Sequence, residues 1–197
     1  MLRGVYFITD SKFGKHEELA GKALELGVRI IQLREKKAKN GELYVLAKKL
    51  RELTESYDAL LIINDRVDIA IASDADGVHI GQEDLPLEIV REIFDGIIGV
   101  TVHSAEEAKK AKKADYLGAA PIFRTKTKED ARDPIGIEGL KEIVSIAEQP
   151  VFAVGGIGAE NVRNVLECGV AGVAVVSAIA VGDAKNFIEI VNRYLGI

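Results

Sequence analysis

The sequence lacks most of the features that mark specialised classes of protein. Its 197 residues include one cysteine, Cys168, so no intramolecular disulfide can form and no cysteine-based metal site is expected. No apolar run approaches roughly 18 residues, and no basic segment followed by an apolar one opens the chain. We therefore expect a cytoplasmic protein that does not act on membranes.

An excess of basic residues is also absent. Lysine and arginine number 26 against 31 aspartate and glutamate residues, which gives a net charge of −5. A general nucleic-acid binder normally carries a basic excess, so no nucleic-acid partner is expected. Any phosphate group bound by this chain has to be met by cations gathered locally.

What remains is the composition of an ordinary globular protein, with 48% hydrophobic and 29% charged residues. At this length, the composition predicts one domain with a sizeable core over residues 1–197. The sequence leaves the oligomeric state open, a homo-oligomer included.

Short apolar runs alternate with amphipathic segments along the whole chain, which predicts parallel strands joined by helices. The expected strands are Val5–Thr9, Arg29–Leu33, Ala59–Ile63, Gly77–Ile80, Ile97–Val102, Tyr116–Ala120, Val151–Val154 and Val173–Val176. The expected helices are Lys15–Leu26, Gly41–Ser56, Val67–Ala72, Pro86–Phe94, Ala105–Lys113, Ile137–Ala147, Ala159–Glu167 and Ala184–Tyr194.

Eight such units favour an α/β fold in the form of a single closed (β/α)8 TIM barrel, close to the lower size limit of roughly 200 residues. The alternative is an open doubly wound sheet. Its most specific sign, a Gly-x-Gly-x-x-Gly motif after the first strand, is absent, since Asp10–Gly14 follows instead.

In a barrel of this kind the active site lies at the carboxyl ends of the strands, where polar residues should gather. The second expected strand runs into Gln32, Leu33, Arg34, Glu35 and Lys36. Strand alternation puts Gln32, Arg34 and Lys36 on one face, where an amide and two cations call for an anion such as a diphosphate. The alternative is an Arg–Glu surface pair at a fraying strand end.

Carboxylates follow the next two strands. Asn64 and Asp65 follow the third, and Asp84 comes shortly after the fourth. Two carboxylates beside a phosphate site suit Mg²⁺, which combines a few carboxylates with phosphate oxygens and water. Both aspartates can also serve as helix N-caps, a role that is compatible with metal binding.

The three histidines differ in their expected roles. His103 follows the fifth strand together with Thr101, whose hydroxyl can donate to a phosphate, and we expect His103 to be structural or to position a substrate. His79 lies within a buried strand and is expected to be a core histidine with a satisfied hydrogen bond. His16 is expected on the surface of the first helix.

Small residues end the last two strands, at Gly155 and Gly156 and at Ser177. The loops after strands seven and eight form a recurrent phosphate site in these barrels. Without side chains the two glycines let backbone N–H groups approach an anion, so a monophosphate site is expected here.

A long loop rich in lysine and threonine follows the sixth strand, at residues 124–133. Connections in compact α/β proteins are usually roughly 2–6 residues long, so a longer one is commonly a binding loop or a lid. Thr125, Lys126, Thr127 and Lys128 offer hydroxyls and ammonium groups to an anion. The alternative is a solvated charged loop.

Together these segments resemble the thiamine-phosphate synthase family, and the resemblance covers essentially the whole chain in order. The matching segments are Val5–Asp10, Gln32–Lys36, Ile63–Arg66, Gly77–Asp84, Gly118–Phe123, Thr125–Lys128 and Gly155–Ile157. Thr101 stands where members often have serine, and Arg124 adds a cation to a variable loop.

The resemblance implies a transferase that joins a hydroxymethylpyrimidine diphosphate to a thiazole ethyl phosphate, giving thiamine phosphate and diphosphate. It implies that Gln32 to Lys36, Asn64, Thr101 and Lys128 hold the pyrimidine diphosphate. Asp65 and Asp84 would coordinate Mg²⁺, while Thr125, Lys126, Thr127, Gly156, Val176 and Ser177 would hold the thiazole phosphate. The catalytic cations would be Arg34, Lys36 and Lys128, because charge develops on a leaving diphosphate.

Two alternatives stay open on the sequence. One is the related thiazole tautomerase, which shares the barrel and the thiazole phosphate site; a proton shuttle, however, needs no diphosphate clamp, and the full set of Gln32, Arg34, Lys36, Asp65 and Asp84 argues against it. The other is a non-catalytic sensor that binds both phosphate ligands without releasing diphosphate.

Overall fold

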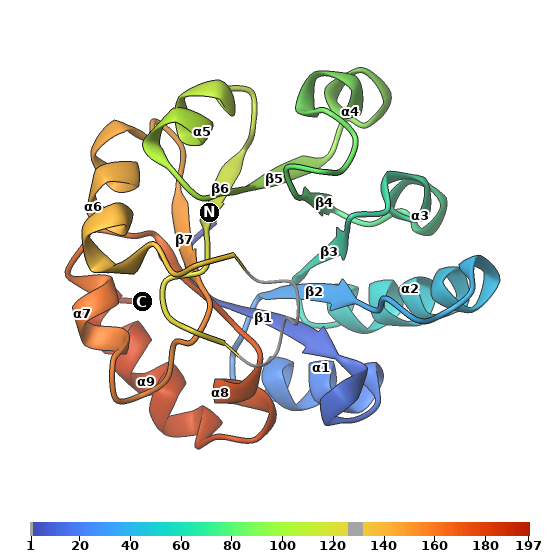
Figure 1. Ribbon diagram of the computed structural model, residues 1–197. Helices are drawn as coiled ribbons and strands as arrows, with labels where there is room; N and C mark the ends of the chain where they lie inside the picture. The colour runs from blue at the N-terminus through green and yellow to red at the C-terminus, as the bar shows by residue number, and fades with distance from the viewer. Residues whose placement is uncertain (1, 126–131) are drawn as a thin grey trace.

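The computed structural model describes residues 2–125 and 132–197, and its centre is a closed barrel of eight parallel strands in sequential order, as Figure 1 shows. The strands are β1 Gly4–Asp10, β2 Ile30–Arg34, β3 Leu60–Asn64, β4 Gly77–Ile80, β5 Ile97–Val102, β6 Tyr116–Ala119, β7 Val151–Val154 and β8 Gly172–Val175. The barrel closes where β1 pairs with β8, in the register Gly4 to Gly172. The predicted (β/α)8 barrel is confirmed.

Helices surround the barrel (Figure 1). They are α1 His16–Glu25, α2 Asn40–Glu55, α3 Val67–Ser73, α4 Leu87–Ile93, α5 Ala105–Lys110, α6 Gly136–Ile146, α7 Val162–Leu166, α8 Ser177–Ala180 and α9 Ala184–Leu195, with a short 3-10 helix, η1, at Ser11–Phe13. Most bounds lie within one or two residues of those predicted. The predicted N-cap of α5 is confirmed, since the hydroxyl of Ser104 accepts a hydrogen bond from N of Glu107.

Helices α5, α7 and α8 differ most from the prediction, and α5 ends at Lys110 instead of Lys113. The seventh helix begins at Val162 instead of Ala159, because the side chain of Asn161 holds the preceding turn. Its Oδ1 accepts from N of Gly158 and its Nδ2 donates to O of Gly156. The four-residue helix α8 was not expected as a separate element, since Ser177–Ala180 is too short for a periodic pattern to be recognised.

Alternation along the strands divides the core into two parts. Outward residues such as Phe7, Ile31 and Leu61 pack against the helices in the main hydrophobic core. Inward residues form a smaller cluster inside the barrel, with Tyr6, Tyr116 and Phe152 at its centre. These three rings meet edge to face, with centroids 5.5–5.8 Å apart. They fill the barrel interior and close it from below.

The amino-terminal ends of the strands carry two matching ion pairs. Asp76 accepts from Arg51 of α2 at 3.2 Å and from N of Leu61. Asp115 accepts from Arg91 of α4 at 2.6 Å and from N of Ile98. Each aspartate therefore joins a helix to the end of a neighbouring strand, and this face of the barrel serves stability.

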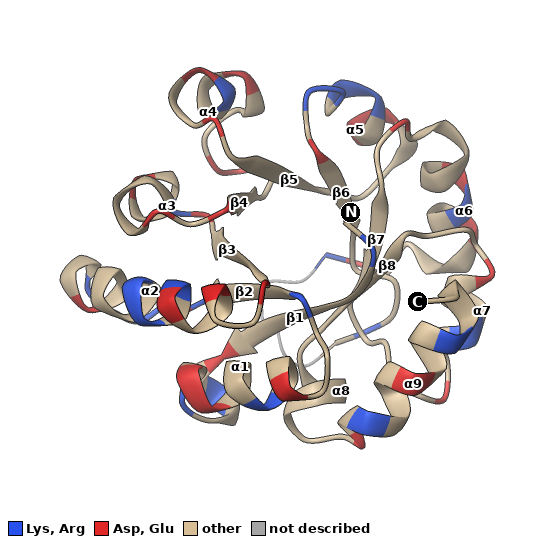
Figure 2. Ribbon diagram, turned by 180° about the vertical axis from the view of Figure 1, so that it is seen from behind, with Lys and Arg blue, Asp and Glu red and all other residues tan. Residues whose placement is uncertain are grey.

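Charged residues are concentrated on the outer helices, while the strands carry few (Figure 2). Among the residues that the structure describes, no helix is long and apolar enough to cross a membrane.

Candidate functional site

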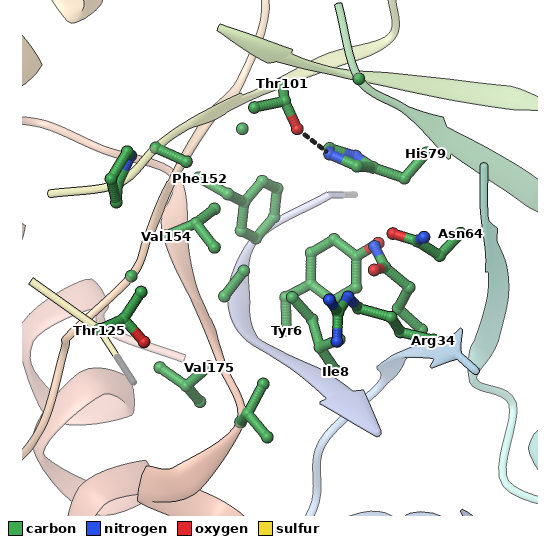
Figure 3. A pocket seen from close by; sticks show the side chains of 18 of the residues that line it. Tyr6, Ile8, Arg34, Asn64, His79, Thr101, Thr125, Phe152, Val154 and Val175 are labelled. Atoms are coloured by element: carbon green, nitrogen blue, oxygen red, sulfur yellow. Dashed lines mark hydrogen bonds between the residues drawn. The ribbon is translucent and has the colours of Figure 1, made fainter. Parts of the chain in front are cut away.

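A cavity of about 370 Å³ opens at the carboxyl ends of the strands, and its floor is the aromatic cluster inside the barrel. Side chains of opposite character face each other across it, as Figure 3 shows. Arg34, Asn64, His79 and Thr101 lie along one part of the wall, and Phe152, Val154 and Val175 lie opposite with Thr125. The cavity therefore has a polar, charged half from β2 to β5 and an apolar half from β7 and β8.

The end of β2 supplies the cationic part of the wall. Gln32 and Arg34 point into the barrel and line the cavity, and Lys36 lines it just beyond the strand. Arg34 donates to Oδ2 of the buried Asp10 at 2.7 Å, and Oδ1 of Asp10 accepts from N of Lys12. Arg34 is thus held in place by the neighbouring strand.

Two members of the same segment point the other way. Leu33 is buried in the core between the barrel and the helices. Glu35 accepts hydrogen bonds from N of Lys37 at 2.6 Å and contacts Nε2 of His16 at 3.2 Å. The structure therefore does not bring these two side chains to the cavity, as strand alternation dictates.

The expectation that His16 lies on the surface is wrong. His16 is 5% exposed, and its Nδ1 lies 2.7 Å from the hydroxyl of Thr9, on the outward face of β1. Its other nitrogen contacts Glu35. Burial alone would raise the pKa of Glu35, but hydrogen bonds from Ser11, N of Lys37 and His16 outweigh it and lower the pKa to about 2. The cluster of Thr9, His16 and Glu35 therefore holds the loop that follows β2 from the outer side of the barrel.

The aspartates predicted to bind a metal line the same cavity. Asp65 adopts a left-handed backbone conformation, with φ of 63°, and its N–H donates to O of His79 at 2.8 Å. Asp84 accepts from N of Gly81 at 2.7 Å through Oδ2. Asn64, at the end of β3, lines the cavity between them and β2. Within residues 2–125 and 132–197, no group of three or more His, Cys, Asp or Glu side chains is arranged to hold a metal ion.

His79 makes the predicted core contacts and also lines the cavity. Its Nδ1 lies 2.9 Å from the Tyr116 hydroxyl, and its Nε2 lies 2.8 Å from the hydroxyl of Thr101.

His103 also lines the cavity, with Nδ1–H donating to O of Ala120 and its backbone N–H donating to Glu107. These contacts fit the structural or positioning role expected of His103.

Sequence reasoning missed the inward residues on the cavity floor. Tyr6, Tyr116 and Phe152 line the cavity but were not singled out. Strand alternation could have placed them, because each lies an even number of residues before an inward residue at the strand end.

The glycine loop after β7 lies directly against the start of the loop after β6. Gly155 and Gly156 have φ of 101° and 66°, which few other residues adopt. A Cβ atom on Gly156 would lie 2.7 Å from O of Arg124. Backbone hydrogen bonds from Ile122 to Val154 and from Phe123 to Gly155 hold the two loops together.

A second cavity, of about 570 Å³, continues from this point toward α8. Thr125, Gly156, Ile157 and Ser177 line both cavities, while Val176 lines the first. The predicted phosphate-binding residues of the last two strand ends are therefore brought together with Thr125. Lys126, Thr127 and Lys128 lie outside the described residues.

Comparison with known proteins agrees with this architecture. The family model described as thiamine monophosphate synthase matches residues 5–179. The thiamine-phosphate synthase of Archaeoglobus fulgidus is 56% identical, over 96% of this chain and 94% of its own. That of Pyrococcus furiosus is 52% identical, over 89% and 86%.

A solved structure extends the likeness to three dimensions. The thiamine phosphate pyrophosphorylase of Pyrococcus furiosus has a TM-score of 0.89 at 45% identity, covering 98% of this chain and 95% of its own. The tautomerase and sensor alternatives find no support in these comparisons.

Proposed function

This chain belongs to the thiamine monophosphate synthase family, and from that premise we propose which of its residues carry the reaction. Its activity is that of a thiamine-phosphate synthase, a transferase that forms thiamine phosphate. The substrates are 4-amino-2-methyl-5-hydroxymethylpyrimidine diphosphate and 4-methyl-5-(2-phosphoethyl)thiazole, the latter with or without a 2-carboxylate. Thiamine phosphate and diphosphate are the products, together with carbon dioxide where the thiazole carries the carboxylate.

The observation that supports the assignment of residues is the division of the cavity into two unlike halves. Gln32, Arg34, Lys36, Asn64 and Thr101 form a wall of amides, cations and a hydroxyl. A diphosphate carries enough negative charge to satisfy the two cations, and charge-assisted hydrogen bonds to it are strong. We propose that the pyrimidine diphosphate binds to this half, with Lys128 and the backbone of Leu33 and Glu35 completing its site.

The thiazole phosphate is proposed to bind at the junction of the two cavities. Thr125 and Ser177 present hydroxyls there, and Gly156 lines both cavities with them, with no side chain of its own. Val176 precedes α8, and Lys126 and Thr127 belong to the same proposed set. The apolar wall of Phe152 and Val154 suits the carbon faces of the two rings.

The residues present fit a magnesium ion. Asp65 and Asp84 are half-buried, line the same cavity as Arg34 and offer hard oxygen ligands. The hydrogen bond from Gly81 engages one oxygen of Asp84, which leaves the other for a cation. Mg²⁺ commonly takes one or two carboxylates with substrate phosphates, so a cluster of three is not required. When bound, the ion supplies positive charge beside the diphosphate.

These residues act on a reaction in which the bond between the pyrimidine methylene and the diphosphate oxygen breaks first. Arg34, Lys36 and Lys128 stabilise the charge that develops on the leaving diphosphate. The electron-rich aminopyrimidine supports the positive charge left on the methylene carbon. The thiazole nitrogen then attacks that carbon, so the two halves of the cavity accelerate the reaction by holding the rings in line.

We propose further that residues 1–197 act as one catalytic domain and that the protein works in the cytoplasm, as its sequence predicts. The test of the proposed function is to mix both substrates with the protein and Mg²⁺ and to measure thiamine phosphate by chromatography. Formation that needs both substrates supports it. Binding of both without product would leave the sensor alternative, and isomerisation of the thiazole alone would leave the tautomerase.

A further inference from the structure

A continuous chain of hydrogen bonds crosses the barrel beneath the cavity, from β2 to β5. Nε2 of Gln32 donates to the Tyr6 hydroxyl at 2.6 Å, and that hydroxyl lies 2.9 Å from the hydroxyl of Tyr116. Nδ1 of His79 follows at 2.9 Å, and Nε2 of His79 lies 2.8 Å from the hydroxyl of Thr101. The chain therefore joins two residues that belong to the proposed pyrimidine diphosphate site.

The packing around this chain is built to hold its rings. A Cβ atom on Gly99 would lie 2.0 Å from Cζ of Tyr116, and one on Gly118 would lie 3.0 Å from Cε1 of His79. Gly99 therefore leaves the space that the Tyr116 ring occupies, and a Cβ atom at position 118 would press on the His79 ring. His79 stacks on Tyr116 with centroids 5.5 Å apart at 28°. The contact between Nε2 of His79 and the hydroxyl of Thr101 is drawn in Figure 3.

The chain has a direction, because each hydroxyl carries one proton. Burial raises the pKa of Tyr6 and of Tyr116 above its ordinary value, so both stay protonated at neutral pH. The Tyr6 hydroxyl accepts from the amide of Gln32, and its own buried proton needs an acceptor, which the Tyr116 oxygen at 2.9 Å can supply. In that arrangement Tyr116 donates to Nδ1 of His79, and the ring proton is then on Nε2.

The last link decides what the cavity offers to a ligand. With the proton on Nε2, His79 donates to the hydroxyl oxygen of Thr101 at 2.8 Å, and the proton of that hydroxyl is then directed to another acceptor. The backbone carbonyl of Thr101 already accepts from Nε2 of Gln82 at 2.6 Å. The Thr101 hydroxyl would form its strongest hydrogen bond with a negatively charged oxygen of a ligand in the cavity.

We propose that His79 is a positioning residue whose Nε2–H tautomer, set by Tyr116, Tyr6 and Gln32, makes Thr101 a donor to an anionic oxygen of the substrate. The reverse direction would present an oxygen lone pair to the diphosphate and weaken its binding. This inference rests on the proposed function, in which Thr101 binds the pyrimidine diphosphate.

The tautomer can be measured directly by ¹⁵N NMR of histidine-labelled wild-type protein at neutral pH. The chain has three histidines, so the spectrum is simple, and the variants His16→Gln and His103→Gln assign His79 by elimination. A protonated Nε2 with an unprotonated Nδ1 supports the proposal. A proton on Nδ1 with an unprotonated Nε2 would overturn it, whether or not the protein turns its substrates over.

Two matched variants test whether the direction matters to the substrate. His79→Gln can keep a donor near the position of Nε2, whereas His79→Asn is too short to reach Thr101. We expect the Asn variant to raise KM for the pyrimidine diphosphate about 10-fold, the Gln variant to stay within about 3-fold of wild type, and KM for the thiazole phosphate to change little in either. Equal KM increases for both substrates would indicate a structural role alone and overturn the proposal.

A double variant tests whether His79 affects substrate binding through the Thr101 hydroxyl or by another route. If His79 acts through this hydroxyl, His79→Asn adds less than about a 2-fold effect to the KM of Thr101→Val. Effects that multiply would contradict the proposal. Failure of the wild-type protein to form thiamine phosphate would refute the proposed function, and the tautomer would still decide the direction of the chain.

Discussion

The carboxylate of Asp10 and the guanidinium of Arg34 lie 2.7 Å apart at the paired carboxyl ends of β1 and β2. Asp10 is 4% exposed and is fixed in turn by the N–H of Lys12. An arginine held in this way loses little side-chain freedom when it binds an anion. The pair therefore prepares the cationic wall of the cavity before the substrate arrives.

Replacing Asp10 with asparagine should release this constraint on Arg34. We expect KM for the pyrimidine diphosphate to rise about 10-fold, because the guanidinium has to be ordered on binding. KM for the thiazole phosphate should stay within about 2-fold, since Arg34 lies in the other half of the cavity. Steady-state kinetics with each substrate varied in turn provide the measurement.

The matched control for Asp10→Asn is Asp115→Asn, which breaks an aspartate–arginine pair on the opposite face of the barrel. That variant should lower the melting temperature and leave both KM values unchanged. If Asp115→Asn altered KM as much as Asp10→Asn, the special role of the Asp10 to Arg34 contact would be refuted.

Asp84 is expected to matter to the diphosphate alone. Asp84→Asn should lower turnover by about 10²-fold, because it removes a carboxylate from the proposed magnesium site. Binding of the thiazole phosphate, measured by calorimetry, should be nearly unchanged. The control is Asp68→Asn, an exposed carboxylate that pairs with Arg66 at the start of α3. An equal loss of turnover and of thiazole phosphate binding in Asp84→Asn would overturn the division into two sites.

Gly156 is expected to tolerate no side chain. In Gly156→Ala the new Cβ would lie 2.7 Å from O of Arg124 and 2.8 Å from Cβ of Phe123, so the two loops have to separate. We expect thiazole phosphate affinity to fall about 10-fold and stability to fall by about 1–3 kcal/mol. Isothermal calorimetry and urea unfolding measure the two effects.

Gly196→Ala provides the control for backbone strain. Its φ of 69° nearly equals that of Gly156, but a Cβ atom there would meet no atom of the described residues within 4 Å, its own chain neighbours aside. This variant should lose stability through strain alone and keep wild-type affinity for the thiazole phosphate. Unchanged affinity in Gly156→Ala as well would show that the contact between the loops does not shape the site.

Stability at acid pH should depend on Glu35. Its pKa is about 2 in the folded protein, below its ordinary value of 4.5, so its contribution is present above about pH 4.5 and is lost as pH falls toward 2. The stability difference between wild type and Glu35→Gln should therefore shrink by up to about 3 kcal/mol over this range. Urea unfolding at pH 6 and at pH 2.5 measures it.

Glu148→Gln is the reference for that measurement, since the side chain of Glu148 is 78% exposed. Its stability difference from wild type should stay nearly constant between the two pH values. A Glu35→Gln difference that also stayed constant would contradict the account of the His16 and Glu35 cluster.

Local patterns were sufficient to predict the barrel. Alternating apolar runs and amphipathic segments located the strands and most helices, because a strand buried on both faces has a composition that differs sharply from a surface helix. The start of the seventh helix was less predictable. It depends on two hydrogen bonds that the Asn161 side chain makes with the preceding turn, and local side-chain bonds of this kind compete with helix formation.

The polar strand ends were likewise visible in the sequence, whereas contacts between strands were not. His16 looked like a surface residue on its own helix, and only the packing of α1 onto the outer face of β1 and β2 buries it against Thr9 and Glu35. The same holds for His79, whose two partners come from β5 and β6. Contacts of this kind can be predicted only when the pairing register of the barrel strands is known.

The most direct test of the two-site account is the release of diphosphate from the pyrimidine substrate. The protein is mixed with pyrimidine diphosphate and thiazole phosphate, together and singly, with Mg²⁺ or with a chelator, and free diphosphate is followed over time. Rapid release is expected only with both substrates and the metal, and slow or no release otherwise. Release that proceeded at full rate with the chelator present, or none under any condition, would contradict it.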